Sequence, residues 1–233
     1  FNRMKADGIL PSPVTFVCVL KACGTIGAAT KGQEIHARIL MEGLLDKNDL
    51  VCTALIDMYA KSGHLVEAQQ LFDRLPTRNV VSWGALIAGY AQHGQGYVSL
   101  MLFNELLKES VLPDNFIYSS ILKSCSSIGA IYEGRCAHDL LIRDGVEIDT
   151  NLGCTLLDLY AKWGCLEEMV KIFVSLPYKN VVAWNVIIER YADYGQSFLV
   201  LELLGKMQHE GITPDILTFI LTLKACGYVE LLT

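Results

Sequence analysis

The sequence predicts an all-α solenoid, in which helix-turn-helix units stack in a row. Three observations predict this fold class: blocks of sequence return at a fixed distance, each unit holds two apolar stripes at helical spacing, and no run alternates as a strand would. Hydrophobic residues make up 52% of the 233 residues and charged residues 19%, which is too apolar for a disordered segment. A single hairpin cannot bury its own stripe, so neighbouring units must share a core.

The sequence repeats with a period of 101 residues, and each period contains shorter related units. Residues 55–63 return as residues 156–164, and Val80–Trp83 returns as Val181–Trp184. Because 101 residues are too many for one supersecondary unit, each copy is divided into three. Residues 1–12 are the expected tail of a preceding unit, and residues 216–233 open a following one, so the chain looks like a piece of a longer protein. The six intact units are residues 13–48, 49–79, 80–114, 115–149, 150–180 and 181–215.

The unit 80–114 illustrates the two helices expected in each unit. Its first helix carries an apolar stripe of Trp83, Leu86, Ile87 and Tyr90. After a turn marked by glycine, its second helix carries Val98, Leu100, Met101, Phe103 and Leu106. Proline is expected to stop the second helices and to direct the chain into the next unit, at Pro11, Pro76, Pro113, Pro177 and Pro214.

Composition excludes several classes of protein. The formal net charge of −6 argues against a protein that coats nucleic acid by bulk attraction. Apolar runs such as Val81–Ala91 are broken well before the length of a membrane span, so no membrane segment is expected. The eight cysteines include no C-x-x-C pair, and no metal site is expected. Cys18, Cys23 and Cys125 fall on apolar helix faces, where buried, reduced thiols are expected.

Recurring motifs distinguish three types of unit. The standard (P) type carries residues 80–91 and Leu112–Asp114, and the long (L) type carries residues 19–23 and 32–37. The short (S) type carries residues 54–63 and 72–76. These motifs resemble the pentatricopeptide repeat family, specifically its plant PLS subclass, which alternates three unit types. The resemblance implies L-type units at 13–48 and 115–149, S-type units at 49–79 and 150–180, and P-type units at 80–114 and 181–215. The partial units at 1–12 and 216–233 would be P type and L type.

Resemblance to this family implies binding of single-stranded RNA, with one base read by each unit. In the family, the fifth and last residues of a unit meet a base edge, and the second residue packs on base faces. The implied base-reading pairs are Val17 with Asn48, Thr53 with Asn79, Gly84 with Asp114, Ser119 with Asp149, Cys154 with Asn180, and Asn185 with Asp215. The implied stacking residues are Val14, Leu50, Val81, Phe116, Asn151 and Val182, followed by Leu217 in the next unit.

Hydrogen-bonding capacity and the family pattern together suggest bases for three units. Asp only accepts, so it suits the ring N–H of guanine or uracil, whereas Asn can donate to the ring acceptor of adenine or cytosine. In the family, a small hydroxyl residue at the fifth position indicates a purine and Asn indicates a pyrimidine. Thr53 with Asn79 then suggests adenine, and Asn185 with Asp215 suggests uracil.

Ser119 with Asp149 suggests guanine. The other fifth residues, Val17, Gly84 and Cys154, do not belong to the readable set. With RNA running 5′ to 3′ alongside the chain, the expected sequence over residues 49–215 is A-N-G-N-U.

Two lysines end the first helices of the short units at equivalent places. Lys61 and Lys162 are candidates for phosphate contacts by family resemblance. The alternative is that each is a solvated side chain favoured by the helix dipole.

No catalytic residue or cofactor site is expected. His36 and His138 are equivalent copies, and repetition favours a packing role, because a catalytic residue is needed only once. Some members of the subclass carry a zinc deaminase with H-x-E and P-C-x-x-C motifs, and neither motif occurs in this sequence.

Two classes of function remain. The first is RNA recognition for a mitochondrial or chloroplast RNA-processing or C-to-U editing factor, whose chemistry comes from another domain or from RNA-editing partner proteins. The second is a helical-repeat scaffold that binds proteins. The incomplete units at Phe1 and after Ile216 lack stacking partners, so self-association through these ends is also expected.

Overall fold

The computed structural model describes residue 4, residues 10–45 and residues 48–230. These residues form α-helices and no strand, which confirms the predicted all-α helical-repeat fold. Most of the expected tail 1–12 and the last residues of the unit 216–233 lie outside the described residues. The helices are α2 (Pro13–Ile26), α3 (Ala29–Met41), α4 (Asp49–Lys61), α5 (Leu65–Asp73), α6 (Val80–Gln92), α7 (Gly96–Lys108), α8 (Asn115–Ile128), α9 (Ile131–Arg143), α10 (Thr150–Lys162), α11 (Leu166–Ser175), α12 (Val181–Asp193), α13 (Ser197–His209) and α14 (Ile216–Glu230).

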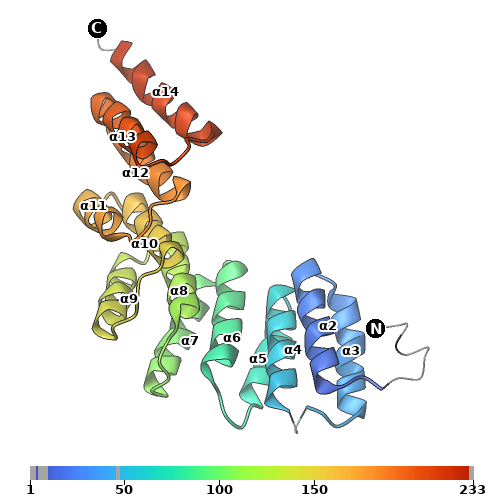
Figure 1. The fold of residues 1–233 in the computed structure, drawn as a ribbon. Coiled ribbons are helices and arrows are strands. Elements are labelled where there is room, and N and C mark those ends of the chain that lie inside the picture. The colour runs from blue at the N-terminus through green and yellow to red at the C-terminus, as the bar shows by residue number, and fades with distance from the viewer. Residues whose placement is uncertain (1–3, 5–9, 46–47, 231–233) are drawn as a thin grey trace. The chain divides into compact units, whose positions relative to one another are not determined.

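The helices belong to two compact units, Phe1–Ile128 and Gly129–Thr233. In the first compact unit, α2, α4, α6 and α8 pack in chain order as one layer (Figure 1). The second layer is α3, α5 and α7, and each of these packs against the first-layer helix before it and the one after it. In the second compact unit, α10, α12 and α14 form one layer, and α11 and α13 pack between them in the same way. Each of these five second-layer helices therefore joins two successive hairpins.

A buried aromatic pair repeats at this joint. Trp83 of α6 is fully buried, and its ring lies 4.6 Å from that of Phe72 on α5. In the second compact unit, Trp184 of α12 is 1% exposed and lies 4.8 Å from Phe173 of α11. Both pairs are edge-to-face, a geometry that adds about 0.5–1.5 kcal/mol beyond the burial of the rings. The contact thus stabilises the same junction in both compact units.

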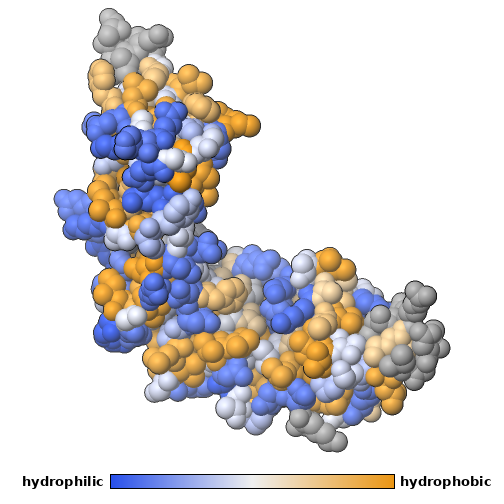
Figure 2. All heavy atoms as spheres, in the orientation of Figure 1, coloured by the Kyte–Doolittle hydropathy of each residue, from blue (hydrophilic) through white to orange (hydrophobic). Residues whose placement is uncertain are grey.

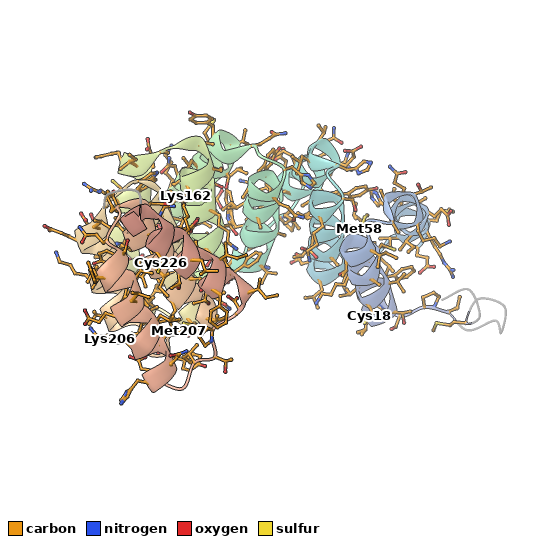
Figure 3. The ribbon with its side chains drawn as sticks, turned by 90° about the horizontal axis from the view of Figure 1, so that it is seen from above. Cys18, Met58, Lys162, Lys206, Met207 and Cys226 are labelled. Atoms are coloured by element: carbon orange, nitrogen blue, oxygen red, sulfur yellow. The ribbon has the colours of Figure 1, made fainter. Side chains whose placement is uncertain are left out.

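Small residues let the hairpins approach closely. Met58 of α4, labelled in Figure 3, lies beside Gly24 of α2 and Gly32 of α3. A Cβ at Gly24 would come within 3.2 Å of the Met58 Cα, and one at Gly32 would overlap the Met58 side chain. Glycine at these two places is therefore required by packing rather than by backbone conformation.

Left-handed residues, rather than prolines, end α7 and α13. Pro113 and Pro214 lie five residues beyond the last residue of these helices, so the prediction that proline stops them is wrong. Pro76 and Pro177 lie three and two residues beyond α5 and α11, which end without a left-handed residue. The α7 helix gives way to Ser110, which has φ of 57°. Its repeat equivalent after α13 is Gly211, with φ of 77°. A left-handed residue reverses the helical backbone at once, and proline only prevents helix from resuming downstream.

Two half-buried histidines lie against tyrosines. His36 Nδ1 is 2.9 Å from the Tyr59 hydroxyl, and His138 Nδ1 is 2.9 Å from the Tyr160 hydroxyl. Burial lowers the pKa of His36 and of His138, and for His36 the nearby Arg74 lowers it further. The equivalent contacts give both histidines a packing role in the described structure.

All eight cysteines are free. Cys23 and Cys125 are buried, but Cys18 is exposed on α2, so its expected burial is wrong (Figure 3). The buried positions of α2 include Phe16 and Leu20, and a residue halfway between them on a helix points to the opposite side. Among the described residues, no helix is both long and apolar enough to cross a membrane.

Replacing Ser110 by Gly should stabilise the protein. A non-glycine residue in the left-handed region costs about 1–2 kcal/mol, and glycine avoids most of this cost. We expect Ser110→Gly to raise the free energy of unfolding by about 1 kcal/mol in urea titrations. Ser127→Gly, inside α8, is the matched control and should lower it by about 0.5 kcal/mol. A Ser110→Gly protein no more stable than the parent would contradict this account.

The histidines should make stability fall in mild acid. Their folded-state pKa values lie below the ordinary value of 6.5, so the unfolded chain binds protons more readily than the folded one. The free energy of unfolding should therefore fall as the pH drops through 6.5 and level off below the folded-state pKa values. We expect the double variant His36→Gln, His138→Gln to show a flatter dependence between about pH 7 and pH 5. Thermal unfolding across this range would measure it, and identical slopes would disprove it.

Candidate nucleic-acid interface

The last residue of each expected unit caps the first helix of the next. In every case the side-chain Oδ1 accepts a hydrogen bond from a backbone N–H in the first helical turn, at 2.8–3.2 Å. The capping residues and the donors are Asn48 and Val51, Asn79 and Ser82, Asp114 and Ile117, Asp149 and Leu152, Asn180 and Ala183, and Asp215 and Thr218. Six of the twelve residues expected to meet base edges, the last residue of each unit, are thus helix caps as well.

Capping decides which atom of the side chain is left for a ligand. A backbone N–H can donate only to an oxygen, so a capping Asn keeps its Nδ2 donor for other partners. A capping Asp keeps its second carboxylate oxygen, which only accepts. Asn and Asp at this position therefore offer opposite hydrogen-bonding groups from the same backbone geometry.

In the first compact unit, several of the expected site residues line one hollow of about 330 Å³ over α2, α4, α6 and α8. It brings together the expected base-reading residues Val17, Thr53, Gly84 and Asp114 with the expected stacking residues Leu50, Val81 and Phe116. Asn48 and Asn79 are not among its walls. Ser119, in the same compact unit, is half-buried on α8 and lies outside it. Lys21, Ala54, Asp57, Val80 and Ala85 complete the lining.

The second residues of the units are apolar side chains left in solvent. Val14, Leu50, Val81, Phe116, Val182 and Leu217 each expose between 50% and 73% of their surface. Asn151 is the polar exception, and it is exposed too. Figure 2 shows that apolar surface is interspersed with hydrophilic surface on the face of the molecule in view. At Gly84 a Cβ would lie 3.3 Å from the Phe116 ring, so glycine gives this ring its place beside the hollow.

In the second compact unit, the pair Asn185 and Asp215 is already hydrogen-bonded. Asn185 is 5% exposed, and its Nδ2 donates to Asp215 Oδ1 at 3.0 Å. Thr218, the third residue of the following unit, lies 2.6 Å from Asn185 Oδ1 through its hydroxyl. Hydrogen bonds from Thr218 and Asn185 lower the pKa of Asp215, which keeps this carboxylate ionised. The pair is thus a rigid, charged feature of the free protein.

The neighbouring pair, Cys154 and Asn180, is less polar. The Cys154 thiol lies 3.6 Å from Asn180 Oδ1, and burial raises the pKa of this thiol. Because the thiol is neutral and weakly polar, it offers a base little beyond van der Waals contact.

The two expected phosphate contacts are engaged by carboxylates. Lys61 Nζ lies 2.7 Å from Asp57, and Lys162 Nζ lies 2.9 Å from Asp158, each one helical turn away. Figure 3 shows Lys162 at the end of its helix. A phosphate would have to compete with these ion pairs.

Sequence reasoning missed two groups of residues. The lysines Lys21 and Lys123 are repeat equivalents, both exposed, and each lines a hollow on the first-helix layer. The recurring Leu-Lys-Ala/Ser-Cys motif marks them. The helix caps were also signalled, since Asn or Asp stood directly before each apolar helical stripe.

No metal centre lies in the part of the chain that the structure describes, where no three His, Cys, Asp or Glu side chains gather closely enough to hold an ion.

Family models match several segments of the chain. The model for the PPR repeat family matches residues 78–127 and 179–227, and the model for the PPR repeat matches residues 50–80 and 154–181. These segments cover more than half of the sequence. Both models describe a repeat rather than an enzyme domain, in agreement with the lack of a catalytic motif.

Relatives from Arabidopsis thaliana match over nearly the whole chain. Pentatricopeptide repeat-containing protein At1g50270 is 37% identical over 228 residues, which cover 98% of this chain and 38% of that protein. The mitochondrial protein At1g06140 is 32% identical, with 98% and 41% covered. The chloroplastic protein At4g18520 is 34% identical, with 99% and 37% covered. The chain spans about two fifths of the length of these relatives.

Solved structures share the fold. The pentatricopeptide repeat protein PPR10, in complex with an 18-nt psaJ RNA element, superposes with a TM-score of 0.76 at 20% identity, over 98% of this chain and 34% of that one. The structure of PPR10 from maize gives a TM-score of 0.57 at 18% identity, with 96% and 38% covered. At these identities the likeness concerns the fold. With the matched repeat models, the Arabidopsis relatives and the helical solenoid, the chain belongs to the pentatricopeptide repeat family.

Proposed function

We propose that this chain binds single-stranded RNA along the layer of its first helices, one nucleotide to a unit. The observation that carries the proposal is the hollow over α2, α4, α6 and α8, where exposed Leu50, Val81 and Phe116 lie beside the capping Asp114. An apolar side chain can pack on the face of any base, and a polar cap can meet its edge. The complex of PPR10 with an 18-nt RNA element, on a similar fold, supports the proposal.

The capping geometry supports a base assignment for three units. The donor that Asn79 keeps suits the ring acceptor of adenine, with Thr53 beside it in the expected pair. The acceptors that Asp149 and Asp215 keep suit the ring N–H of guanine and of uracil. We propose the order A-N-G-N-U over residues 49–215, with N at the units that carry Gly84 and Cys154.

We further propose that the units alternate as in the PLS subclass, with the boundaries given above. The chain would then be the recognition segment of a mitochondrial or chloroplast RNA-processing or C-to-U editing factor. Its chemistry would come from another domain or from RNA-editing partner proteins. Relatives that are named mitochondrial and chloroplastic support an organelle.

A protein-binding scaffold is the second candidate, and α14 favours it. This helix exposes Ile216, Phe219, Ile220 and Leu223, each by 50–80%. An apolar face of this kind suits contact with another protein surface. Self-association through this end stays a prediction, and the part of it that concerns Phe1 lies outside the described residues.

Removing the exposed lysine of α8 should weaken RNA binding without changing base preference. We propose that exposed Lys123 contacts one phosphate, so Lys123→Ala should lower affinity for all oligonucleotides alike. The slope of log affinity against log salt should become less negative by about 0.7, the value for one contact on a single strand. Fluorescence anisotropy at several salt concentrations would measure both. Lys108→Ala, at the exposed end of α7, is the control and should leave the slope unchanged.

Shortening the fifth residue of the unit 181–215 should change the preferred base. In Asn185→Thr the capping Asp215 still accepts from a ring N–H, while the smaller side chain leaves room for a purine. We therefore expect preference at this position to shift from uracil toward guanine. Binding would be compared for oligonucleotides that carry each of the four bases there. Gln208→Thr on α13 is the control, and an unshifted preference in Asn185→Thr would refute the assignment.

A further inference from the structure

We infer that Thr218 is a positioning residue that determines the specificity of the preceding unit, 181–215, by fixing the Asn185 amide. This inference rests on the proposed RNA binding and goes beyond the fifth and last residues of the unit. Thr218 belongs to the following unit, on the first turn of α14, and it is fully buried.

Four close contacts surround the Thr218 hydroxyl and backbone. The Thr218 N–H donates to Asp215 Oδ1 at 2.8 Å, and the hydroxyl accepts from the Asp215 N–H at 3.1 Å. The hydroxyl also lies 2.6 Å from Asn185 Oδ1 and 2.9 Å from Asp215 Oδ1. These contacts tie the fifth residue of one unit to the third residue of the next.

The hydroxyl has a single proton, and its environment indicates where that proton goes. Asp215 Oδ1 already accepts from the Thr218 N–H and from Asn185 Nδ2. Asn185 Oδ1 accepts from Thr218 alone among the described residues, and its distance to the hydroxyl is the shorter of the two. The hydroxyl therefore donates to Asn185.

This donation sets the orientation of the amide. Oδ1 of Asn185 faces Thr218, and Nδ2 faces Asp215. In the reversed orientation two acceptor oxygens would meet at Asp215, and the Thr218 hydroxyl would lose Asn185 Oδ1 as its acceptor. A base therefore meets an amide donor from Asn185 beside the carboxylate acceptor of Asp215. Uracil matches this pair with a carbonyl and a ring N–H.

Without the Thr218 hydroxyl, the contact with Asp215 alone would hold the amide, so the amide would turn over more often. In one orientation the amide offers its donor to the O4 carbonyl of uracil, and in the other it offers its oxygen to the N4 amino group of cytosine. Thr218 disfavours the second orientation, and so it favours uracil over cytosine. One hydrogen bond of this kind corresponds to about a three- to tenfold preference.

The other junctions lack this bridge in the part of the chain that the structure describes. Ser82 is the third residue of the unit 80–114, but its hydroxyl donates to the backbone oxygen of Asn79, and the fifth residue of the preceding unit is Thr53. Ala183 has no hydroxyl at all. Ser82 is thus a matched control, since it shares the reciprocal cap of Thr218 without a partner amide.

The test compares Thr218→Val with Thr218→Ser in RNA binding. The probes are A-N-G-N-U oligonucleotides with uracil or cytosine at the last position. We expect Thr218→Val to reduce the uracil-to-cytosine affinity ratio about three- to tenfold. Thr218→Ser, which keeps the hydroxyl, should retain the ratio, as should Ser82→Ala. A folded Thr218→Val protein with the parent ratio would overturn the inference.

A transplant keeps the inference testable if Thr218→Val fails to fold. Thr53→Asn with Asn79→Asp recreates the amide and the capping carboxylate beside Ser82. We expect a preference for uracil over cytosine at this unit, and its reduction when Ser82→Ala is added. Equal ratios with and without Ser82→Ala would overturn the inference. If the unsubstituted chain binds none of the oligonucleotides, the proposed function fails, and the inference falls with it.

Discussion

One hydrogen bond recurs at every junction: the side chain before each first helix accepts from a backbone N–H of its first turn. This bond satisfies a donor that the helix itself cannot, and its loss typically costs about 1 kcal/mol. It also fixes the side chain at the start of a helix in the first layer. Because the capping bond is the same in every unit, the capping residue is held at the same place relative to the helix that it caps. The proposed base contacts depend on this constraint.

The layer of second helices makes the repetition of this geometry possible. Within the compact units, α3, α5, α7, α11 and α13 each pack between two successive first helices, so a hairpin buries its apolar stripe only with its neighbours. The paired rings of Phe72 and Trp83, and of Phe173 and Trp184, stabilise equivalent joints. Packing is thus concentrated on one side of the first helices, and their second residues remain exposed on the other. Separate faces for packing and for binding let apolar residues such as Leu50 stay in solvent without weakening the core.

Much of the fold could be predicted from the sequence, because each copy of the repeat corresponds to the same set of helix hairpins. The 101-residue period and the helical stripes predicted the hairpins, whereas the capping role of Asn and Asp at the ends of the units was missed. The errors came from local detail. Cys18 lies on the exposed side of α2, and Ser110 ends α7 ahead of Pro113. The bridge from Thr218 to Asn185 joins residues 33 apart on different helices, and no periodic pattern specifies the direction of an amide.

Helix capping also limits which bases the last residue of a unit can distinguish. Only Asn, Asp, Ser and Thr cap helices well with their side chains, and of these Asn and Asp reach furthest from the backbone. A capping Asn keeps a donor for the base, and a capping Asp keeps an acceptor. The capping residue can therefore distinguish a base with a ring acceptor from a base with a ring N–H, but it distinguishes little else. Adenine and cytosine both present a ring acceptor, and guanine and uracil both present a ring N–H. The choice within each pair must therefore come from another residue, and the fifth residue is placed to make it. At Asn185 the amide is buried and fixed from the next unit, so this choice is shared between neighbouring units.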